Sequence, residues 1–392
     1  MDDQRQELKR RVADVVEEHR WELIDLSLRI HAHPEIAFQE EKAAAWLRDY
    51  LEAKGFSVER SICDIATAFR ASYGEGQPRV AFVAEYDALP GVGHGCGHNI
   101  IAAASVGAAV AAKEVLSHTG GTIVVVGTPA EEAEGGKVYM VRRGAFEGLD
   151  AALIAHPGNR DVAVARSLAC VEIWVEYFGR EAHAASRPED GINALDAMVI
   201  AYNAISALRQ QLRDSARIHG IITDGGQAVN VIPAHAAARF LVRAEDDHYL
   251  EALKERVLAC FQAGAEATGA RLEYHWDEAQ YAAMCNNMPL VEAYRRNAEA
   301  LGREMEEPEG RRSMGSTDMG NVSRVVPAIH PTIAIAPPEV SIHTPQFREI
   351  AASEAGHQGL LDAAKALAMT AVDFLADADL RRRAWEEFRR SE

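Results

Sequence analysis

Hydrophobic and polar positions form two different patterns along the chain. Residues 5–30 and 40–55 place apolar side chains every three to four positions, which predicts amphipathic helices. Four shorter runs are almost continuously apolar, which is typical of buried strands; they are residues 80–86, 122–128, 151–156 and 332–336. The alanine-rich segment 99–116 lies between two of these runs and predicts a further helix, with Asn99 as its N-cap. Strands that alternate with helices predict an α/β fold with a mostly parallel sheet, covered by helices on both faces.

The pattern changes between residues 169 and 278. A strand, a helix, two strands, a helix and a final strand follow one another in this segment. That order is the split βαβ arrangement of a ferredoxin-like α+β domain. We therefore predict an α/β domain formed by residues 1–168 and 279–392, with residues 169–278 inserted as a second domain.

Composition narrows the class of partners. The formal net charge of −18 disfavours a nucleic acid or an anionic membrane surface, since both would repel the chain. The polar N-terminal segment does not resemble a signal peptide, and no apolar run reaches the roughly 18 residues that span a bilayer. The five cysteines are odd in number and scattered, which does not indicate a disulfide framework. We expect a cytoplasmic protein.

Reactive side chains follow the ends of all four predicted strands. In open α/β sheets, ligands bind beyond the carboxyl ends of the strands, so we expect these side chains to meet at one edge of the sheet. In chain order they are Asp87, Cys96 and His98 after the first run, Glu131 and Glu132 after the second, His156 at the end of the third, and His343 after the fourth.

This combination of side chains favours a metal site. Thiol, imidazole and carboxylate ligands together suit zinc, manganese or cobalt better than calcium or magnesium. Glu131 and Glu132 are adjacent and point in different directions, so one can bind metal while the other takes a proton from water. A Cys–His nucleophile built on Cys96 is the alternative, but it leaves Glu132, His156 and His343 unexplained.

Several motifs resemble those of peptidase family M20, whose members are dinuclear metallopeptidases and amidohydrolases. They occur in the family's order, and the most similar branch contains p-aminobenzoyl-glutamate hydrolase subunits and aminoacylase-like dipeptidases. The motifs are DALPGVGHGCGHN, TPAEE, AHP, GREAHAA, GGQAVNVIP and HTPQF. The resemblance covers nearly the whole chain and implies a zinc-peptidase-like catalytic domain with an inserted lid or dimerisation domain.

The resemblance also implies a role for each matching residue. Glu131 falls on the general base, and His183 falls on a lid histidine that stabilises the oxyanion, often across a dimer. Asn230 falls on a substrate contact, Arg243 is a candidate carboxylate clamp, and Asp87 orients a metal ligand by hydrogen bonding. The implied ligands of two divalent ions are Cys96, His98, Glu132, His156 and His343. Cys96 takes the bridging place that an aspartate holds in better-known members.

The expected function follows from these roles. We expect a metal-dependent hydrolase that cleaves the amide bond of an N-acyl amino acid, an aminobenzoyl-glutamate-like compound or a dipeptide with a free carboxylate. We also expect a homodimer formed through the inserted domain. Two alternatives are hydrolytic deamination of an aromatic amine by the same activated water, and a metal-binding protein without catalysis.

Overall fold

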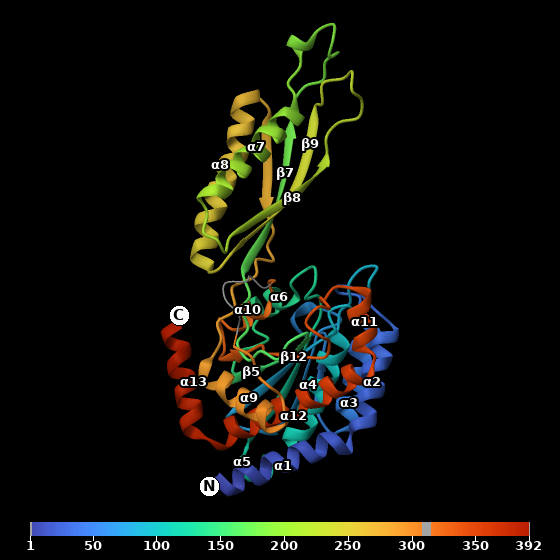
Figure 1. The fold of residues 1–392 in the computed structure, drawn as a ribbon, viewed down its shortest axis with the longest axis vertical. Coiled ribbons are helices and arrows are strands. Elements are labelled where there is room, and N and C mark those ends of the chain that lie inside the picture. The colour runs from blue at the N-terminus through green and yellow to red at the C-terminus, as the bar shows by residue number, and fades with distance from the viewer. Residues whose placement is uncertain (1, 308–314, 392) are drawn as a thin grey trace. The chain divides into compact units, whose positions relative to one another are not determined.

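The computed structural model describes residues 2–307 and 315–391 (Figure 1). Contacts between Cα atoms divide the chain into two compact units. The larger unit contains the chain up to Arg166, the segment that begins at Met284, and the chain from Thr317 onward. The smaller unit is formed mainly by Ser167–Ala283. No helix of the described residues is long and apolar enough to cross a membrane.

A six-stranded sheet forms the centre of the larger unit. Its order is β1-β2-β4-β3-β5-β11, and the β4–β3, β3–β5 and β5–β11 pairs are parallel, whereas β1 and β2 form an antiparallel edge. The predicted mostly parallel sheet is therefore confirmed. The strands are β1 (Ser57–Arg60), β2 (Phe69–Glu75), β3 (Arg79–Glu85), β4 (Gly121–Thr128), β5 (Ala151–Leu153) and β11 (Ala328–Ile329).

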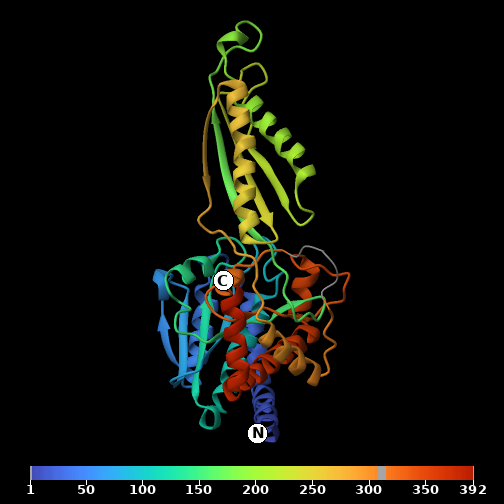
Figure 2. The ribbon, with the colours of Figure 1, turned by 90° about the vertical axis from the view of Figure 1, so that its left-hand side faces the viewer.

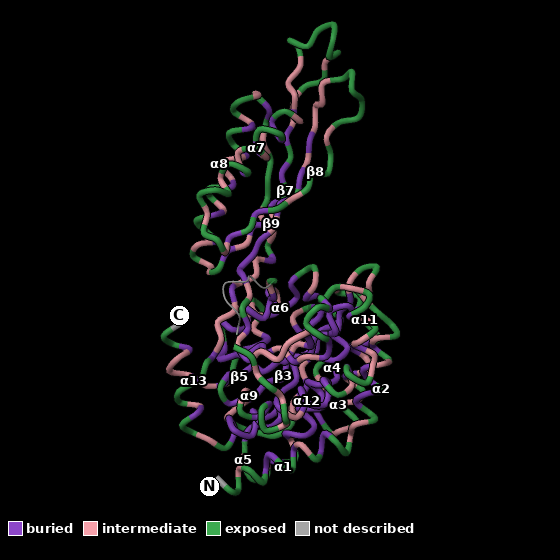
Figure 3. Tube along the Cα trace, in the orientation of Figure 1, coloured by how far each residue is buried: buried purple, intermediate pink, exposed green. Residues whose placement is uncertain are grey.

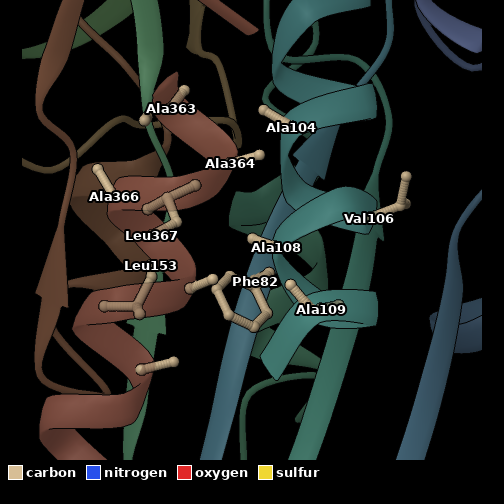
Figure 4. Close-up of a cluster of buried hydrophobic side chains, with 14 of the residues drawn as sticks. Phe82, Ala104, Val106, Ala108, Ala109, Leu153, Ala363, Ala364, Ala366 and Leu367 are labelled. Atoms are coloured by element: carbon tan, nitrogen blue, oxygen red, sulfur yellow. The ribbon is translucent and has the colours of Figure 1, made fainter. Parts of the chain in front are cut away.

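Helices cover both faces of this sheet because residues of β3 and β4 alternate between two hydrophobic clusters. Phe82 and Leu153 pack with α4 and α12 on one face, as Figure 4 shows. Val83 and Val126 pack with α6 and α10 on the other. Figure 3 shows how thoroughly α4 and the central strands are buried. The helices are α1 (Asp2–Glu18), α2 (Arg20–Ala32), α3 (Glu41–Ala53), α4 (His98–Lys113), α5 (Leu116–Thr119), α6 (Gly136–Arg142), α9 (Met288–Ala300), α10 (Met319–Val322), α11 (Pro345–Ala351), α12 (Glu354–Ala376) and α13 (Ala378–Ser391), with the 3-10 turn η1 (Ile62–Asp64).

Three local predictions are wrong. The strand predicted at 151–156 ends at Leu153, and His156 begins the next strand, β6 (His156–Gly158), instead of ending β5. Asn99 does not cap α4, because Gly97 occupies the cap position and the buried Asn99 amide donates hydrogen bonds to Ser27 Oγ and to the carbonyl of Ala351 instead. The strand predicted at 332–336 is shorter, and it does not join the main sheet. It forms β12 (Thr332–Ala334), which pairs with β6 (His156–Gly158) in a separate two-stranded sheet.

The smaller unit is an antiparallel four-stranded sheet with the order β10-β7-β9-β8. Helices α7 and α8 pack on one face of it, as Figure 2 shows. The predicted β-α-β-β-α-β order is confirmed. The elements are β7 (Ala169–Phe178), α7 (Ala194–Leu208), β8 (Arg217–Asp224), β9 (His235–Ala244), α8 (Asp247–Thr268) and β10 (Arg271–Trp276), with the 3-10 turns η2 (Pro188–Asp190) and η3 (Arg209–Gln211).

Candidate metal centre

Cys96 lies at the centre of a cluster of side chains in the larger unit that could ligate a metal ion. Its Sγ atom is 3.3 Å from His156 Nε2 and 3.3 Å from His343 Nε2. Gly97 separates Cys96 from His98 and has a φ of 81°, and a Cβ at Gly97 would lie 2.5 Å from Pro157. Only glycine fits this turn without strain, and the turn brings the thiol and the next imidazole to one site.

Asp87 holds two other members of the cluster. His98 Nδ1–H donates to Asp87 Oδ1 at 2.9 Å, and the backbone N–H of Glu132 donates to Asp87 Oδ2 at 2.9 Å. Because Nδ1 carries the proton in this hydrogen bond, His98 Nε2 is the nitrogen left to bind a metal. This atom lies 3.7 Å from Glu132 Oε1 and 4.0 Å from Glu131 Oε2.

The donor atoms fit a pair of divalent ions. Cys96, His98 and His156 place their ligand atoms within 4.8 Å of one another, and so do Cys96, Glu132 and His343. His98 Nε2 and Glu132 Oε1 are buried and have no hydrogen-bond partner among the described residues, which is costly unless a cation takes that place. Sulfur, nitrogen and oxygen donors together match zinc or a similar transition metal. Cys96 belongs to both groups, so its position suits a bridging ligand.

In the metal-free protein, burial is the main cause of the shifted pKa values of Cys96 and His156. Burial, and then the Glu132 carboxylate, raise the pKa of Cys96 well above its usual range. Burial, with His330 and His98 adding to it, lowers the pKa of His156 to about 3. A neutral thiol is a poor nucleophile and the lowered pKa makes His156 a weak base, so these two pKa shifts disfavour a nucleophile formed by Cys96 and His156. A bound cation would favour the thiolate.

Glu131 has the surroundings of a group that can hold a proton. Its side chain is buried beside His98. Burial, and then the negative charges of Glu85, Asp318 and Glu132, raise the pKa of Glu131 well above its usual range. Such a carboxyl can accept a proton in one step and release it in another.

The structure adds three charged residues that the sequence analysis did not single out. Lys137 Nζ lies 2.7 Å from Glu85 Oε1 and donates to Asp318 Oδ1 at 2.6 Å, and all three side chains are fully buried. Glu85 Oε2 in turn lies 3.6 Å from His98 Nε2. The negative charge of Glu85 next to the cluster is thus balanced by Lys137. In the sequence, the buried charges were indicated only by Glu85, which interrupts the apolar run 80–86.

His183 and Asn230 belong to the smaller unit, where the structure brings them together. His183 pairs with Val231 in an isolated antiparallel bridge, and the N–H of Ala184 donates to the carbonyl of Asn230 at 3.0 Å. Two backbone N–H groups, of Ala185 and Ser186, donate to His183 Nδ1. In the neutral imidazole the proton is therefore on Nε2, which makes this atom a hydrogen-bond donor. His183 and Asn230 are both exposed.

Arg243 is not brought together with His183. It lies near the end of β9, whereas Val231 precedes the start of that strand. Strands rise by about 3.3 Å per residue, so the part of β9 from His235 to Arg243 alone spans about 26 Å. Arg243 Nη1 donates to Ser316 Oγ at 2.7 Å, which holds one arm of the guanidinium.

Comparisons with known proteins cover most of the chain. The family model described as peptidase family M20/M25/M40 matches residues 81–366. The Xaa-Arg dipeptidase of Mus musculus is 39% identical over 399 residues, which cover 97% of this chain and 92% of that protein. One of the p-aminobenzoyl-glutamate hydrolase subunits of Escherichia coli is 30% identical, over 97% of this chain and 95% of that protein.

A solved structure has the same fold. It is that of a Bacillus subtilis protein described as a dinuclear metal binding peptidase from the M20 family. The TM-score is 0.72 at 21% identity, with coverage of 92% of this chain and 99% of the other.

Proposed function

The chain belongs to peptidase family M20/M25/M40, and we propose that it hydrolyses the amide bond of a small substrate whose released amine carries a free carboxylate. It is a metal-dependent amidohydrolase or peptidase. The observation that carries the proposal is the cluster of ligand atoms that shares Cys96, with Glu131 beside it.

Five side chains would hold two divalent ions, zinc or manganese, with cobalt as a further candidate. They are Cys96, His98, Glu132, His156 and His343. When bound, such ions polarise a carbonyl group and lower the pKa of water toward neutrality. Asp87 would keep His98 and Glu132 directed at the ions through the two hydrogen bonds described above.

Glu131 would move the protons. Its carboxylate takes a proton from the attacking water, and it then gives that proton to the nitrogen of the leaving amine. The raised pKa of Glu131, caused first by burial and then by Glu85, supports this role because a carboxyl with a raised pKa holds a proton more readily than an ordinary glutamate does.

Three residues of the smaller unit complete the proposal. His183 donates from Nε2–H to the oxyanion that develops on the scissile carbonyl, since its Nδ1 is already occupied as an acceptor. Asn230 contacts the substrate, and Arg243 binds a substrate carboxylate. A homodimer formed through the smaller unit would allow His183 and Arg243 to serve different active sites, given their separation along β9.

Dipeptides that end in arginine are the first substrates to test. The more similar of the two curated relatives is an Xaa-Arg dipeptidase, and the less similar one belongs to a p-aminobenzoyl-glutamate hydrolase. The net charge of −18 also favours the approach of a cationic dipeptide over that of an aminobenzoyl-glutamate dianion.

The direct experiment is a hydrolysis panel with metal-loaded protein and mass-spectrometric detection of products. The panel would contain Ala-Arg, Lys-Arg, Ala-Glu, N-acetyl-arginine and p-aminobenzoyl-glutamate, with Glu131→Gln as the inactive control. Release of free arginine or another amine from at least one compound supports the proposal. Ammonia from an aromatic amine without amide cleavage would instead support the deaminase alternative. A metal-loaded protein inactive on all classes would support the non-catalytic one.

We propose that the protein is a cytoplasmic homodimer. Size-exclusion chromatography with light scattering measures the mass of the assembly in solution and tests whether it is a dimer. A fully active monomer would contradict a role for His183 across a dimer interface.

A further inference from the structure

The turn that presents Glu131 and Glu132 has an unfavourable backbone conformation. Strand β4 ends at Thr128, and Ala130 immediately before the two carboxylates has a φ of 62°. For a residue with a Cβ atom this left-handed conformation costs about 1–2 kcal/mol. Other contacts must therefore hold the turn in place.

Glu40 provides such a contact from a distant part of the chain. It immediately precedes α3 and has no exposed surface. The backbone N–H of Ala130 donates to Glu40 Oε1 at 2.9 Å, and the N–H of Phe38 donates to the same oxygen at 3.0 Å. Thr67 Oγ1 donates to Glu40 Oε2 at 3.1 Å.

Thr67 is itself fixed to the strand that leads into the metal centre. Tyr86 directly follows β3, and its hydroxyl donates to the carbonyl of Thr67 at 2.7 Å. The carboxylate of Glu40 therefore joins the start of α3, the Thr67 loop and the turn after β4. Glu40 is not a member of any of the groups of metal-ligating atoms found among the described residues.

A buried carboxyl at this place needs its hydrogen bonds. Burial, and then the charge of Asp87, raise the pKa of Glu40 to about 7, although the N–H of Ala130 and the hydroxyl of Thr67 act in the opposite direction. An apolar side chain of similar size would avoid this penalty but would leave the two backbone N–H groups without an acceptor.

We propose that Glu40 is a positioning residue, which holds Ala130 in its left-handed conformation and thereby directs Glu131 and Glu132 into the metal centre. The inference rests on the proposed function, because it assigns Glu40 a part in the geometry of that reaction. A rotation of the backbone at Ala130 would displace both carboxylates, and small displacements of catalytic groups reduce rates strongly.

The test compares Glu40→Leu with Glu40→Gln. Leucine removes the acceptor, and we expect kcat to fall about tenfold or more while KM stays within about twofold. Glutamine keeps one acceptor oxygen for the N–H of Ala130, so Glu40→Gln should retain at least about a third of the wild-type kcat. Glu41→Gln changes the exposed neighbouring carboxylate and is the matched control, for which we expect wild-type rates.

Cobalt(II) binding gives a readout that does not depend on turnover. The visible bands of cobalt(II) respond to the position of a ligating carboxylate, so Glu40→Leu should shift them and Glu40→Gln should leave them close to wild type. Ala130→Gly should recover about threefold of the kcat lost in Glu40→Leu, since glycine adopts a φ of 62° without strain. Each kcat is calculated per folded molecule, with the folded fraction measured by urea unfolding, so that a defect in folding alone would leave the kcat of Glu40→Leu at the wild-type value.

Thr67→Val keeps the inference testable if Glu40→Leu does not fold. This variant removes the hydrogen bond from Thr67 to Glu40, and we expect kcat to fall about threefold with a smaller band shift in the same direction. Wild-type kcat and cobalt bands in Glu40→Leu, or in Thr67→Val where the former does not fold, would overturn the inference. A wild-type protein that binds no cobalt and hydrolyses no substrate would overturn the proposed function, and this inference with it.

Discussion

The two units place most of their candidate functional residues in different environments, and His343, which is exposed in the larger unit, is the exception. In the larger unit, Glu85, Lys137 and His98 have no exposed side-chain surface; Glu85 and Lys137 form an ion pair, and His98 lies within 4 Å of the carboxylates of Glu85 and Asp87. In the smaller unit, His183 and Asn230 are exposed, and backbone N–H groups orient His183. A change of charge in the larger unit should therefore affect both folding and chemistry. A change in the smaller unit should affect chemistry while leaving the fold largely intact.

The largest effect is expected for Glu131→Gln. The variant keeps the shape of the side chain and loses the proton acceptor, so kcat should fall by about 10³-fold or more. Metal content, measured by mass spectrometry, should stay at the wild-type level. Glu134→Gln alters an exposed carboxylate three residues further on and should be close to wild type. Turnover of Glu131→Gln within about tenfold of wild type would contradict the assigned role.

Lys137→Met should mainly destabilise the larger unit. Methionine is similar in length but leaves Glu85 and Asp318 buried without their cation, and breaking such a pair typically costs about 3–5 kcal/mol. Urea unfolding of the metal-free protein measures the change. Lys42→Met, at an exposed position, should change stability by less than about 0.5 kcal/mol. Equal stabilities of the two variants would mean that Lys137 does not balance the buried acids.

His183→Ala should separate chemistry from folding in the smaller unit. Loss of one donor to the oxyanion should lower kcat about 10²-fold, with the melting temperature and metal content unchanged. His248→Ala removes another exposed histidine of the same unit and serves as the control. If both variants kept the wild-type kcat, His183 would have no part in the reaction.

The smallest effect is expected at His235, the first residue of β9. Hydrogen bonds from its ring to Asp224 at 2.7 Å and Glu176 at 2.8 Å raise the pKa of His235 above 6.5, with Asp224 contributing most. The resulting stabilisation is fully present below pH 6.5 and is lost as the pH rises through the raised pKa. Because these side chains are partly exposed to solvent, the effect should not exceed about 1 kcal/mol.

Thermal melting of wild type and His235→Gln between pH 5.5 and 8 tests this expectation. The difference between the two proteins should shrink as the pH rises, and 0.5 M salt should reduce it further. A difference that grows with pH would show that the histidine is not stabilised as a cation.

The sequence predicted the parts of the fold that have a regular pattern. Strands β3 and β4 were predictable because both of their faces are buried, which makes the runs continuously apolar. The side chains that follow β3 and β4 were found because the carboxyl ends of parallel strands share an edge. His343 was found as well, although it follows β12, which pairs outside the main sheet.

Long-range polar contacts were not predictable in the same way. Lys137 and Asp318 are 181 positions apart, and no period in the sequence indicates that a buried lysine would meet a buried aspartate. Asn99 is a second example, because its hydrogen bonds to Ser27 and Ala351 outweigh the tendency of asparagine to occupy the N-cap of a helix. Glu40 stands among exposed charged residues in the sequence, and only tertiary structure places it beneath Ala130.

The metal content of protein purified without chelator tests the central claim most directly. We predict about two transition-metal ions per chain for wild type and a loss of at least one ion in Cys96→Ser, because Cys96 belongs to two of the three groups of ligand atoms among the described residues. Cys260→Ser, in the smaller unit, should keep the wild-type content. A wild-type protein without transition metal, even after reconstitution with zinc, manganese and cobalt, would contradict the claim.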